Sequence, residues 1–137
     1  MRMRDIMSEA VETIAADATV DDARELMRRQ DIRHVVVVKG DAIAGVLSEH
    51  DLRRSEGTSS VRAAMSAPVV TATAQTSLRQ AANLMRGNHV SCLPVLDERR
   101  RLIGIVTVAD LLDLIGKGVT RERNDANRSP TSYVPGR

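Results

Sequence analysis

Hydrophobic and polar positions follow the same order twice along the chain. In the first half, the capping sequence Thr19-Val20-Asp21-Asp22 opens an apolar stripe at helical spacing, and a β-branched run, Val35 to Val38, follows it. In the second half, Ser77 opens a similar stripe and the run is Cys92 to Leu96. A turn and a further apolar segment follow each run, which predicts a hairpin. Ser48 and Thr107 then cap a last helix. Each half therefore predicts the order strand, helix, strand, strand, helix.

The two halves can be aligned residue by residue. Gly45-Val46-Leu47-Ser48-Glu49-His50-Asp51-Leu52 returns as Gly104-Ile105-Val106-Thr107-Val108-Ala109-Asp110-Leu111, and Met7-Ser8 returns as Met65-Ser66. A unit of about 60 residues buries only about 60% of its unfolded surface, so each half needs the other. We expect an α+β fold of two pseudo-symmetric βαββα units packed sheet to sheet. The first repeat with its linker spans 1–58 and the second 59–117.

Local composition adds four expectations. Pro94 lacks a backbone donor, which places it at the start or edge of its strand. Arg86-Gly87-Asn88 is typical of a helix stop. The polar segment 55–60 is a flexible linker in composition. Residues 118–137 show no periodicity and contain two prolines, which predicts a mobile tail.

Overall composition limits the function and location. The 137 residues include no Trp or Phe, so a bound ring would meet branched aliphatic side chains. A net charge of +2 is weak evidence for nucleic acid. The single cysteine, Cys92, excludes an internal disulfide and suits a reducing compartment. No apolar run has the length of a membrane span and the start has no signal-peptide pattern, so we expect no membrane contact and a cytoplasmic protein.

Two βαββα units that each end in Gly-φ-φ-Ser/Thr-x-x-Asp, where φ is apolar, resemble a tandem pair of cystathionine-β-synthase-type (CBS) domains, or Bateman module. The resemblance covers about residues 3–116. It implies two clefts that bind adenosine-containing ligands, namely AMP, ADP, ATP, S-adenosylmethionine or NAD, with no prosthetic group. It also implies a homodimer, for which the stripes containing Ala23, Met27, Ala81 and Met85 are the expected interface.

The resemblance also implies the site residues. The aspartate holds ribose hydroxyls, the Ser/Thr lies near ribose or phosphate, and the start of the central strand walls the base. The first cleft would contain Asp51, Ser48, Ile32, His34 and Val36, with Thr13 near the base. The second would contain Asp110, Thr107, Val90, Cys92 and Pro94, with Thr71 near the base. Val36 stands where the family pattern has proline.

Basic residues distinguish the two predicted clefts. Arg33, His50, Arg53 and Arg54 belong to the first, whereas the corresponding residues of the second are Ser91, Ala109, Leu112 and Asp113. We therefore expect the first cleft to accept a phosphorylated ligand better than the second.

Several interpretations remain open at this point. The chain shows no nucleophile elbow, phosphate loop or paired carboxylates, so we expect no enzyme. His34, His50 and His89 are not spaced like metal ligands, so we expect no metal site.

The leading hypothesis is a free-standing regulatory module that binds an adenine nucleotide and signals to an unidentified protein. Because Ser/Thr-x-x-Asp is also a helix-capping signature, a ligand-free structural or interaction domain is the alternative. Nucleic-acid binding through the tail and Arg99-Arg100-Arg101 is a weaker one, since that triplet is a predicted hairpin tip.

Overall fold

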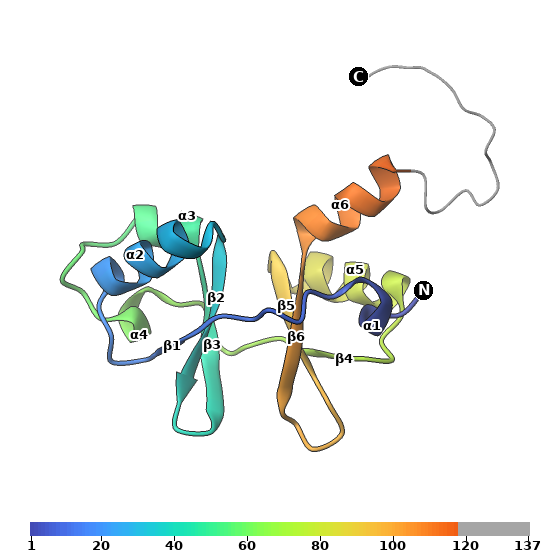
Figure 1. Ribbon diagram of the computed structural model, residues 1–137, viewed down its shortest axis with the longest axis horizontal. Coiled ribbons are helices and arrows are strands. Elements are labelled where there is room, and N and C mark those ends of the chain that lie inside the picture. Colours follow the sequence, from blue (N-terminus) through green and yellow to red (C-terminus); the bar gives the residue numbers. More distant parts are fainter. Residues whose placement is uncertain (118–137) are drawn as a thin grey trace.

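The computed structural model describes residues 1–117, and Figure 1 shows two α+β units side by side, as the repeat predicts. The first unit contains β1 (Thr13–Ala15), α2 (Val20–Gln30), β2 (His34–Lys39), β3 (Ala42–Ser48) and α3 (Glu49–Arg53). The second contains β4 (Ala72–Thr73), α5 (Leu78–Asn88), β5 (Cys92–Leu96), β6 (Leu102–Thr107) and α6 (Val108–Gly116). The predicted tail, 118–137, lies outside the described residues.

Each unit contains one three-stranded sheet whose central strand comes from the predicted apolar run. The strand orders are β1-β2-β3 and β4-β5-β6, with the first pair parallel and the hairpin pair antiparallel. Val35, Val36 and Val37 are fully buried, which explains the unbroken β-branched run. Within residues 1–117, no helix is long and apolar enough to cross a membrane.

The apolar stripes of α2 and α5 pack into the protein's own cores. Ala23 and Ala81 are 0% exposed, and Met27 and Met85 are 5% and 4% exposed. They belong to two separate apolar clusters, one for each sheet. The prediction that these residues form a dimer interface is therefore wrong, because they have no surface left to offer a second chain.

Pro94 lies in the middle of β5, the central strand of its sheet, so its predicted place at a strand start or edge is also wrong. In the first sheet the equivalent Val36 donates its N–H to the carbonyl of Glu12, with N···O 3.1 Å. Pro94 has no such donor, and β4 accordingly begins only at Ala72, beside Val95. The sheet accommodates the proline by shortening the neighbouring strand.

A one-turn helix that the sequence pattern did not predict precedes each unit and packs on the opposite one. These helices are α1 (Met3–Ile6) and α4 (Val61–Ala64). Met3 is fully buried in the core of the second sheet, and Val61 in the core of the first. Backbone hydrogen bonds join Ser8 and Ile105 in both directions, each with N···O 3.0 Å. The two repeats therefore exchange their leading segments, and each segment contributes to the core of the other repeat.

The exchanged segments explain the repeated glycine. Met65 and Ser66 cross directly over Gly45, and a Cβ atom there would lie 2.6 Å from the Ser66 carbonyl oxygen. Met7 and Ser8 cross over Gly104 in the same way, and the Met7 Sδ would be 2.6 Å from such a Cβ. The glycine that opens Gly-φ-φ-Ser/Thr-x-x-Asp therefore makes room for the Met-Ser pair of the other repeat.

We predict that Gly45→Ala lowers the free energy of unfolding by about 1–3 kcal/mol, because the new methyl group meets backbone that can yield little. Gly87→Ala is a matched control. Gly87 is the last residue but one of α5, which ends at Asn88 as the Arg86-Gly87-Asn88 pattern predicted, and a Cβ there has no atom within 4 Å. That change should stabilise by about 0.5–1 kcal/mol. Urea unfolding measures both, and equal stability of the two variants would contradict the crossing.

The segment 55–60 is tied to α2. Val20 donates its N–H to the Ser59 carbonyl (N···O 2.8 Å), and Asp21 donates to that of Gly57 (3.0 Å). Ser60 then caps α4. The linker is polar, as its composition shows, but its carbonyl groups accept hydrogen bonds from the first turn of α2, and its last residue caps α4.

Candidate functional site

A cavity of about 470 Å³, here called the Asp51 cleft, lies between the two repeats. Ser48 and Asp51 contribute from the end of β3 and the start of α3, and the facing wall comes from the segment before β5. Its lining residues are Val46, Ser48, His50, Asp51, Arg54 and Ser66 on one side and His89, Val90, Ser91 and Cys92 on the other, together with His34.

A second cavity of about 340 Å³, the Asp110 cleft, repeats this arrangement. Thr107 and Asp110 contribute from the end of β6 and the start of α6, and the facing wall comes from the segments before β1 and β2. Its lining residues are Ser8, Ile105, Thr107, Ala109 and Asp110, facing Ala10, Val11, Glu12, Asp31, Ile32, Arg33 and His34.

The structure thus exchanges the walls that the sequence assigned to the two aspartates. Ile32 and Arg33, predicted beside Asp51, line the Asp110 cleft, and Val90 and Cys92, predicted beside Asp110, line the Asp51 cleft. The predicted grouping is wrong, because the sheets face each other about a pseudo-twofold axis. The start of one central strand therefore meets the last helix of the other repeat.

Besides Arg53, four predicted residues line neither cleft. Val36 and Pro94 are fully buried within their strands. Thr13 and Thr71 line two other hollows, beside the hairpin tip that contains Arg99 and Arg100. The tip itself was predicted correctly. The cleft residues that the sequence analysis did not find include Ser8 and Ser66, whose 58-residue repeat spacing was a usable signal.

Both aspartates are held in place by helix capping. Asp51 accepts the N–H of Ser48 at Oδ2 (2.9 Å) while Ser48 Oγ accepts the N–H of Asp51 (3.1 Å). Asp110 and Thr107 repeat this pattern at 2.8 and 3.1 Å. The cap engages only one carboxylate oxygen. Asp110 Oδ1 accepts no hydrogen bond from residues 1–117, and Asp51 Oδ1 lies 3.3 Å from Arg54 Nη2. Capping and ligand binding can therefore coexist.

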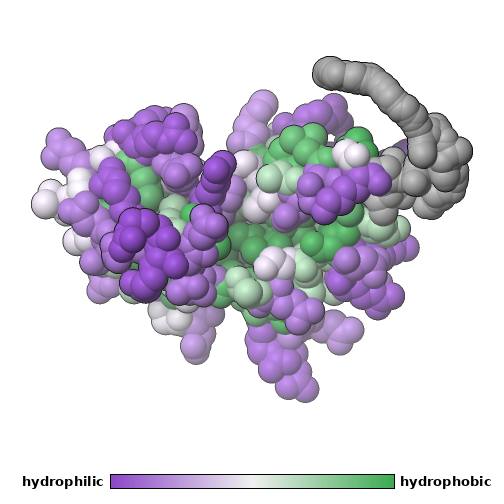
Figure 2. Space-filling view, turned by 45° about the horizontal axis from the view of Figure 1, so that its top comes forward, coloured by the Kyte–Doolittle hydropathy of each residue, from purple (hydrophilic) through white to green (hydrophobic). Residues whose placement is uncertain are grey.

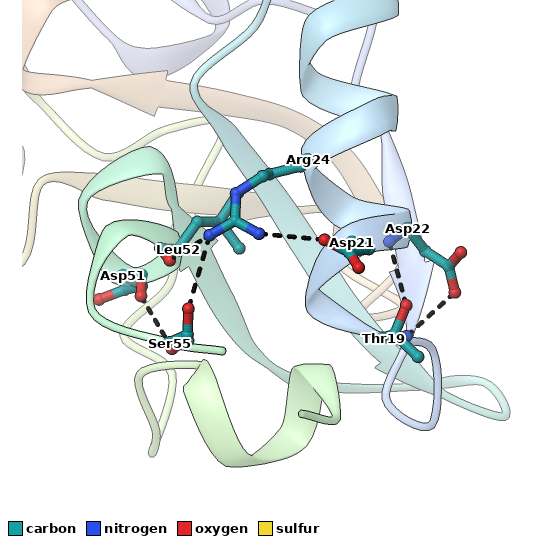
Figure 3. Close-up of polar contacts among 7 residues, drawn as sticks. All are labelled: Thr19, Asp21, Asp22, Arg24, Asp51, Leu52 and Ser55. Atoms are coloured by element: carbon teal, nitrogen blue, oxygen red, sulfur yellow. Dashed lines mark hydrogen bonds and ion pairs between the residues drawn. The ribbon is translucent and has the colours of Figure 1, made fainter. Parts of the chain in front are cut away.

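Figure 3 shows how the C-terminal end of α3 is fixed. Arg24 of α2 donates from Nη2 to the Leu52 carbonyl (2.9 Å), and its Nη1 pairs with Asp21 at 3.1 Å. Ser55 Oγ donates to the carbonyl of Asp51 at 3.0 Å. The residue equivalent to Arg24 in the second repeat is Ala82. α6 therefore lacks this arginine anchor, so the two aspartates are supported differently.

The two clefts differ in charge. Arg54, His34, His50 and His89 line the Asp51 cleft, where the only acid from the described part of the chain is Asp51, which is 7% exposed. The Asp110 cleft contains Arg33 and His34 but three acids, Glu12, Asp31 and Asp110. Part of the difference arises at equivalent positions, the left-handed residues that end α2 and α5, which are Asp31 and His89. The Asp51 cleft is thus the more favourable one for an anion.

Two titratable groups in the clefts have shifted pKa values. Burial lowers the pKa of His34, although the carboxylates of Asp51 and Asp110 partly oppose this shift. Burial raises the pKa of the Cys92 thiol to about 12, so Cys92 is a neutral, apolar wall. Within residues 1–117, no three His, Cys, Asp or Glu side chains are grouped so as to hold a metal ion.

We predict that the protein loses stability as the pH falls below about 6.5, the ordinary pKa of histidine. Since folding lowers the pKa of His34, the unfolded chain binds more protons in this range. The contribution is therefore present above pH 6.5 and is lost on acidification. Urea unfolding at pH 7.5 and 5.5 should show a smaller decrease for His34→Gln than for the unchanged protein. Equal decreases would contradict this role of His34.

The structure thus contains two pseudo-symmetric βαββα units and two clefts between them, and in each cleft a capped aspartate of one repeat faces residues of the other repeat. The model of the CBS domain matches residues 3–57 and 61–117. The chain belongs to the CBS domain family and contains a tandem CBS pair.

Curated relatives are similar over most of this chain. A homoserine O-acetyltransferase of Methanohalobium evestigatum is 34% identical over 114 residues, which are 81% of this chain and 23% of that protein. The chain thus spans about a quarter of the length of the acetyltransferases that it matches. A CBS domain-containing protein of Dictyostelium discoideum is 33% identical over 132 residues, covering 84% of this chain and 91% of its own length.

Solved structures support the fold. The CBS domain pair of protein MJ0100, in complex with 5′-methylthioadenosine and S-adenosylmethionine, superposes with a TM-score of 0.79 at 24% identity, covering 86% of this chain and 98% of its own. The cytosolic domain of the Mg²⁺ channel MgtE, in complex with ATP, has a TM-score of 0.67 at 32% identity, covering 80% and 46%.

Proposed function

We propose that this CBS pair is a regulatory module, not an enzyme, that binds an adenosine-containing nucleotide between its repeats. Binding would change the packing of the repeats, and a partner protein would respond to that change. The candidate ligands are AMP, ADP, ATP, S-adenosylmethionine and NAD. The location expected for it is the cytoplasm. A ligand can shift such an equilibrium only through different affinities for the two states.

The observation that carries the proposal is the placement of the two repeated aspartates. Each is held by its helix cap and faces, across a cavity, apolar side chains from the other repeat. A carboxylate oxygen can accept hydrogen bonds from ribose hydroxyls, and such charge-assisted bonds are about twice as strong as neutral ones. Ile32 and Ile105 in one cleft, and Val90 and Val46 in the other, supply the apolar surface for a base. The ATP complex of the 32% identical MgtE domain supports the same ligand class.

The charge difference between the clefts supports a division of ligands. We assign the phosphorylated ligand to the Asp51 cleft, where Arg54 and three histidines lie. Arg33, which the sequence assigned to this cleft, lines the other, and Arg53 lines neither. The assignment therefore rests on His50, Arg54, His34 and His89.

A thermal-shift screen with AMP, ADP, ATP, S-adenosylmethionine and NAD tests the proposal. A ligand at about 100 times its dissociation constant should stabilise the protein by about 2.7 kcal/mol. No stabilisation by any of them would favour the alternative, a structural or interaction domain whose Ser/Thr-x-x-Asp motifs only cap helices. For nucleic acid the support is weaker, because Arg101 is bound to Asp97 within the hairpin tip, with Nε···Oδ2 2.9 Å.

We further propose a homodimer whose interface includes α6 instead of the buried stripes. Val108, Leu112 and Ile115 form an apolar row on α6 and are 37%, 63% and 58% exposed. Figure 2 shows hydrophobic surface on this half of the molecule. The equivalent residues of the first repeat are charged: Glu49, Arg53 and Glu56. Leu112→Asp should shift the sedimentation coefficient towards that of a monomer, and Arg53→Asp should not. A dimer unaffected by Leu112→Asp would exclude α6.

A further inference from the structure

Among residues 1–117, His34 is the one residue that lines both clefts. It begins β2, the central strand of the first sheet. Its equivalent in the second repeat, 58 residues later, is Cys92, which lines only the Asp51 cleft. The shared wall is therefore asymmetric, with an imidazole from one repeat and no matching polar group from the other.

A hydrogen bond connects His34 to the opposite repeat. Its Nε2 lies 3.0 Å from the Oγ of Ser91, which precedes β5 and lines the Asp51 cleft. A neutral imidazole can donate or accept at this nitrogen, depending on its tautomer. Any ligand that changes the tautomer or rotamer of His34 from the Asp110 cleft would therefore change a polar contact in the Asp51 cleft.

The charges around His34 also come from both clefts. Asp51, Glu49 and Asp110 favour its protonated form, and Arg33 opposes it. Arg54, His50 and His89 share the Asp51 cleft with it, and Glu12 and Asp31 share the Asp110 cleft. A phosphate group in the first cleft would add negative charge near the imidazole and favour the imidazolium ion. The imidazolium ion would in turn face the carboxylate of Asp110.

We propose that His34 couples the two clefts, so that a ligand bound in one changes the affinity of the other. This inference rests on the proposed nucleotide binding and adds a connection between the two sites. Coupling between sites is reciprocal, so each cleft must change the other by the same factor. Couplings of this kind are typically about 5- to 150-fold in affinity, and we expect at least about fivefold here.

The chain contains three histidines, which makes imidazole NMR a direct test. With AMP as the probe, Asp51→Ala confines binding to the Asp110 cleft and Asp110→Ala confines it to the Asp51 cleft. Adenosine serves as the probe for a cleft that does not accept AMP. The His34 ring signals should move in both variants. His50 and His89, which line only the Asp51 cleft, should move only in Asp110→Ala. A His34 signal that responds in one variant alone would overturn the proposal.

Calorimetry measures the coupling itself. In the unchanged protein, one cleft is titrated while the other is already filled. Its affinity should differ by at least about fivefold from the affinity of the same cleft in the variant whose other cleft cannot bind. His34→Ala should abolish this difference, while Arg53→Ala, a change outside both clefts, should retain it. If two ligands bind with no difference, or if His34→Ala leaves the difference intact, the coupling is refuted and nucleotide binding stands. If neither probe binds the unchanged protein, the proposed function fails as well.

Discussion

Asp110→Ala should weaken the binding of an adenosine ligand in the Asp110 cleft by about 10- to 150-fold. A hydrogen bond to a charged group contributes about 1.5–3 kcal/mol, and about 1.4 kcal/mol corresponds to a tenfold change in affinity. Asp51→Ala should have the same effect in its own cleft, and the double variant should bind in neither. Titration calorimetry with AMP and with adenosine gives both affinities.

The aspartates also cap helices, so the experiment needs a control that changes only a cap. Asp22 provides it: Asp22 Oδ2 accepts the N–H of Thr19 (3.0 Å) and Thr19 Oγ1 accepts the N–H of Asp22 (3.1 Å), in the same geometry as the two cleft aspartates. Asp22 is exposed, its hydrogen bonds with Thr19 are drawn in Figure 3, and it lines neither cleft. Asp22→Ala should therefore lower stability slightly and leave binding unchanged. A comparable loss of affinity in Asp22→Ala would mean that capping, not ribose contact, explains the effect.

The two probes also test how the ligands are divided. AMP should lose more affinity in Asp51→Ala than in Asp110→Ala, because the Asp51 cleft contains Arg54 and the histidines. If AMP binding survived Asp51→Ala and vanished in Asp110→Ala, the phosphorylated ligand would belong to the other cleft. Adenosine lacks the phosphate and should show a smaller contrast between the two variants.

The sequence predicted the fold well because a repeat provides two independent views of each element. The capped helices, the apolar runs and the hairpins follow local rules of periodicity and capping. A repeat identifies Asp51 and Asp110 as equivalent, but it does not say which strand start lies opposite each of them. That depends on how two sheets pack, which is a property of surfaces far apart in sequence. For this reason the sequence analysis placed the wrong strand start beside each aspartate.

The same limit explains the other differences. The stripes containing Met27 and Met85 are as apolar as a dimer interface, and only the tertiary packing shows that they are buried in the core. Residues 3–6 lack the length for a detectable helical period, so α1 was missed although Met3 is fully buried. Pro94 cannot donate a backbone hydrogen bond, so the sequence placed it at a strand start or edge. The structure instead keeps it in the middle of β5, and the neighbouring strand β4 is shorter.

Met3→Ala should lower the free energy of unfolding by about 2–5 kcal/mol, the usual cost of truncating a buried methionine. The side chain is 0% exposed and packs among residues of the second repeat. The backbone around it is fixed as well, since Met3 donates to the Thr76 carbonyl (2.9 Å) and Arg4 to that of Ala74 (3.0 Å). A domain of this size is stable by only about 5–15 kcal/mol, so the loss is a large fraction of the total.

Leu112→Ala is the matched control, because Leu112 is 63% exposed and its truncation should change stability by no more than about 0.5 kcal/mol in the monomer. Urea unfolding at low protein concentration measures both variants.

The exchange also predicts how a fragment of residues 59–117 behaves. Without Met3 and the Ser8–Ile105 hydrogen bonds, this fragment lacks part of its core and one neighbour of β6. It should therefore not show a cooperative unfolding transition. A cooperative transition of the isolated fragment, or a Met3→Ala variant as stable as the unchanged protein, would contradict the exchange of leading segments. The clefts would then form between two units that are each stable alone, and a bound ligand could change only the packing at their interface. Exchanged segments, in contrast, allow a bound ligand to change the packing of both cores.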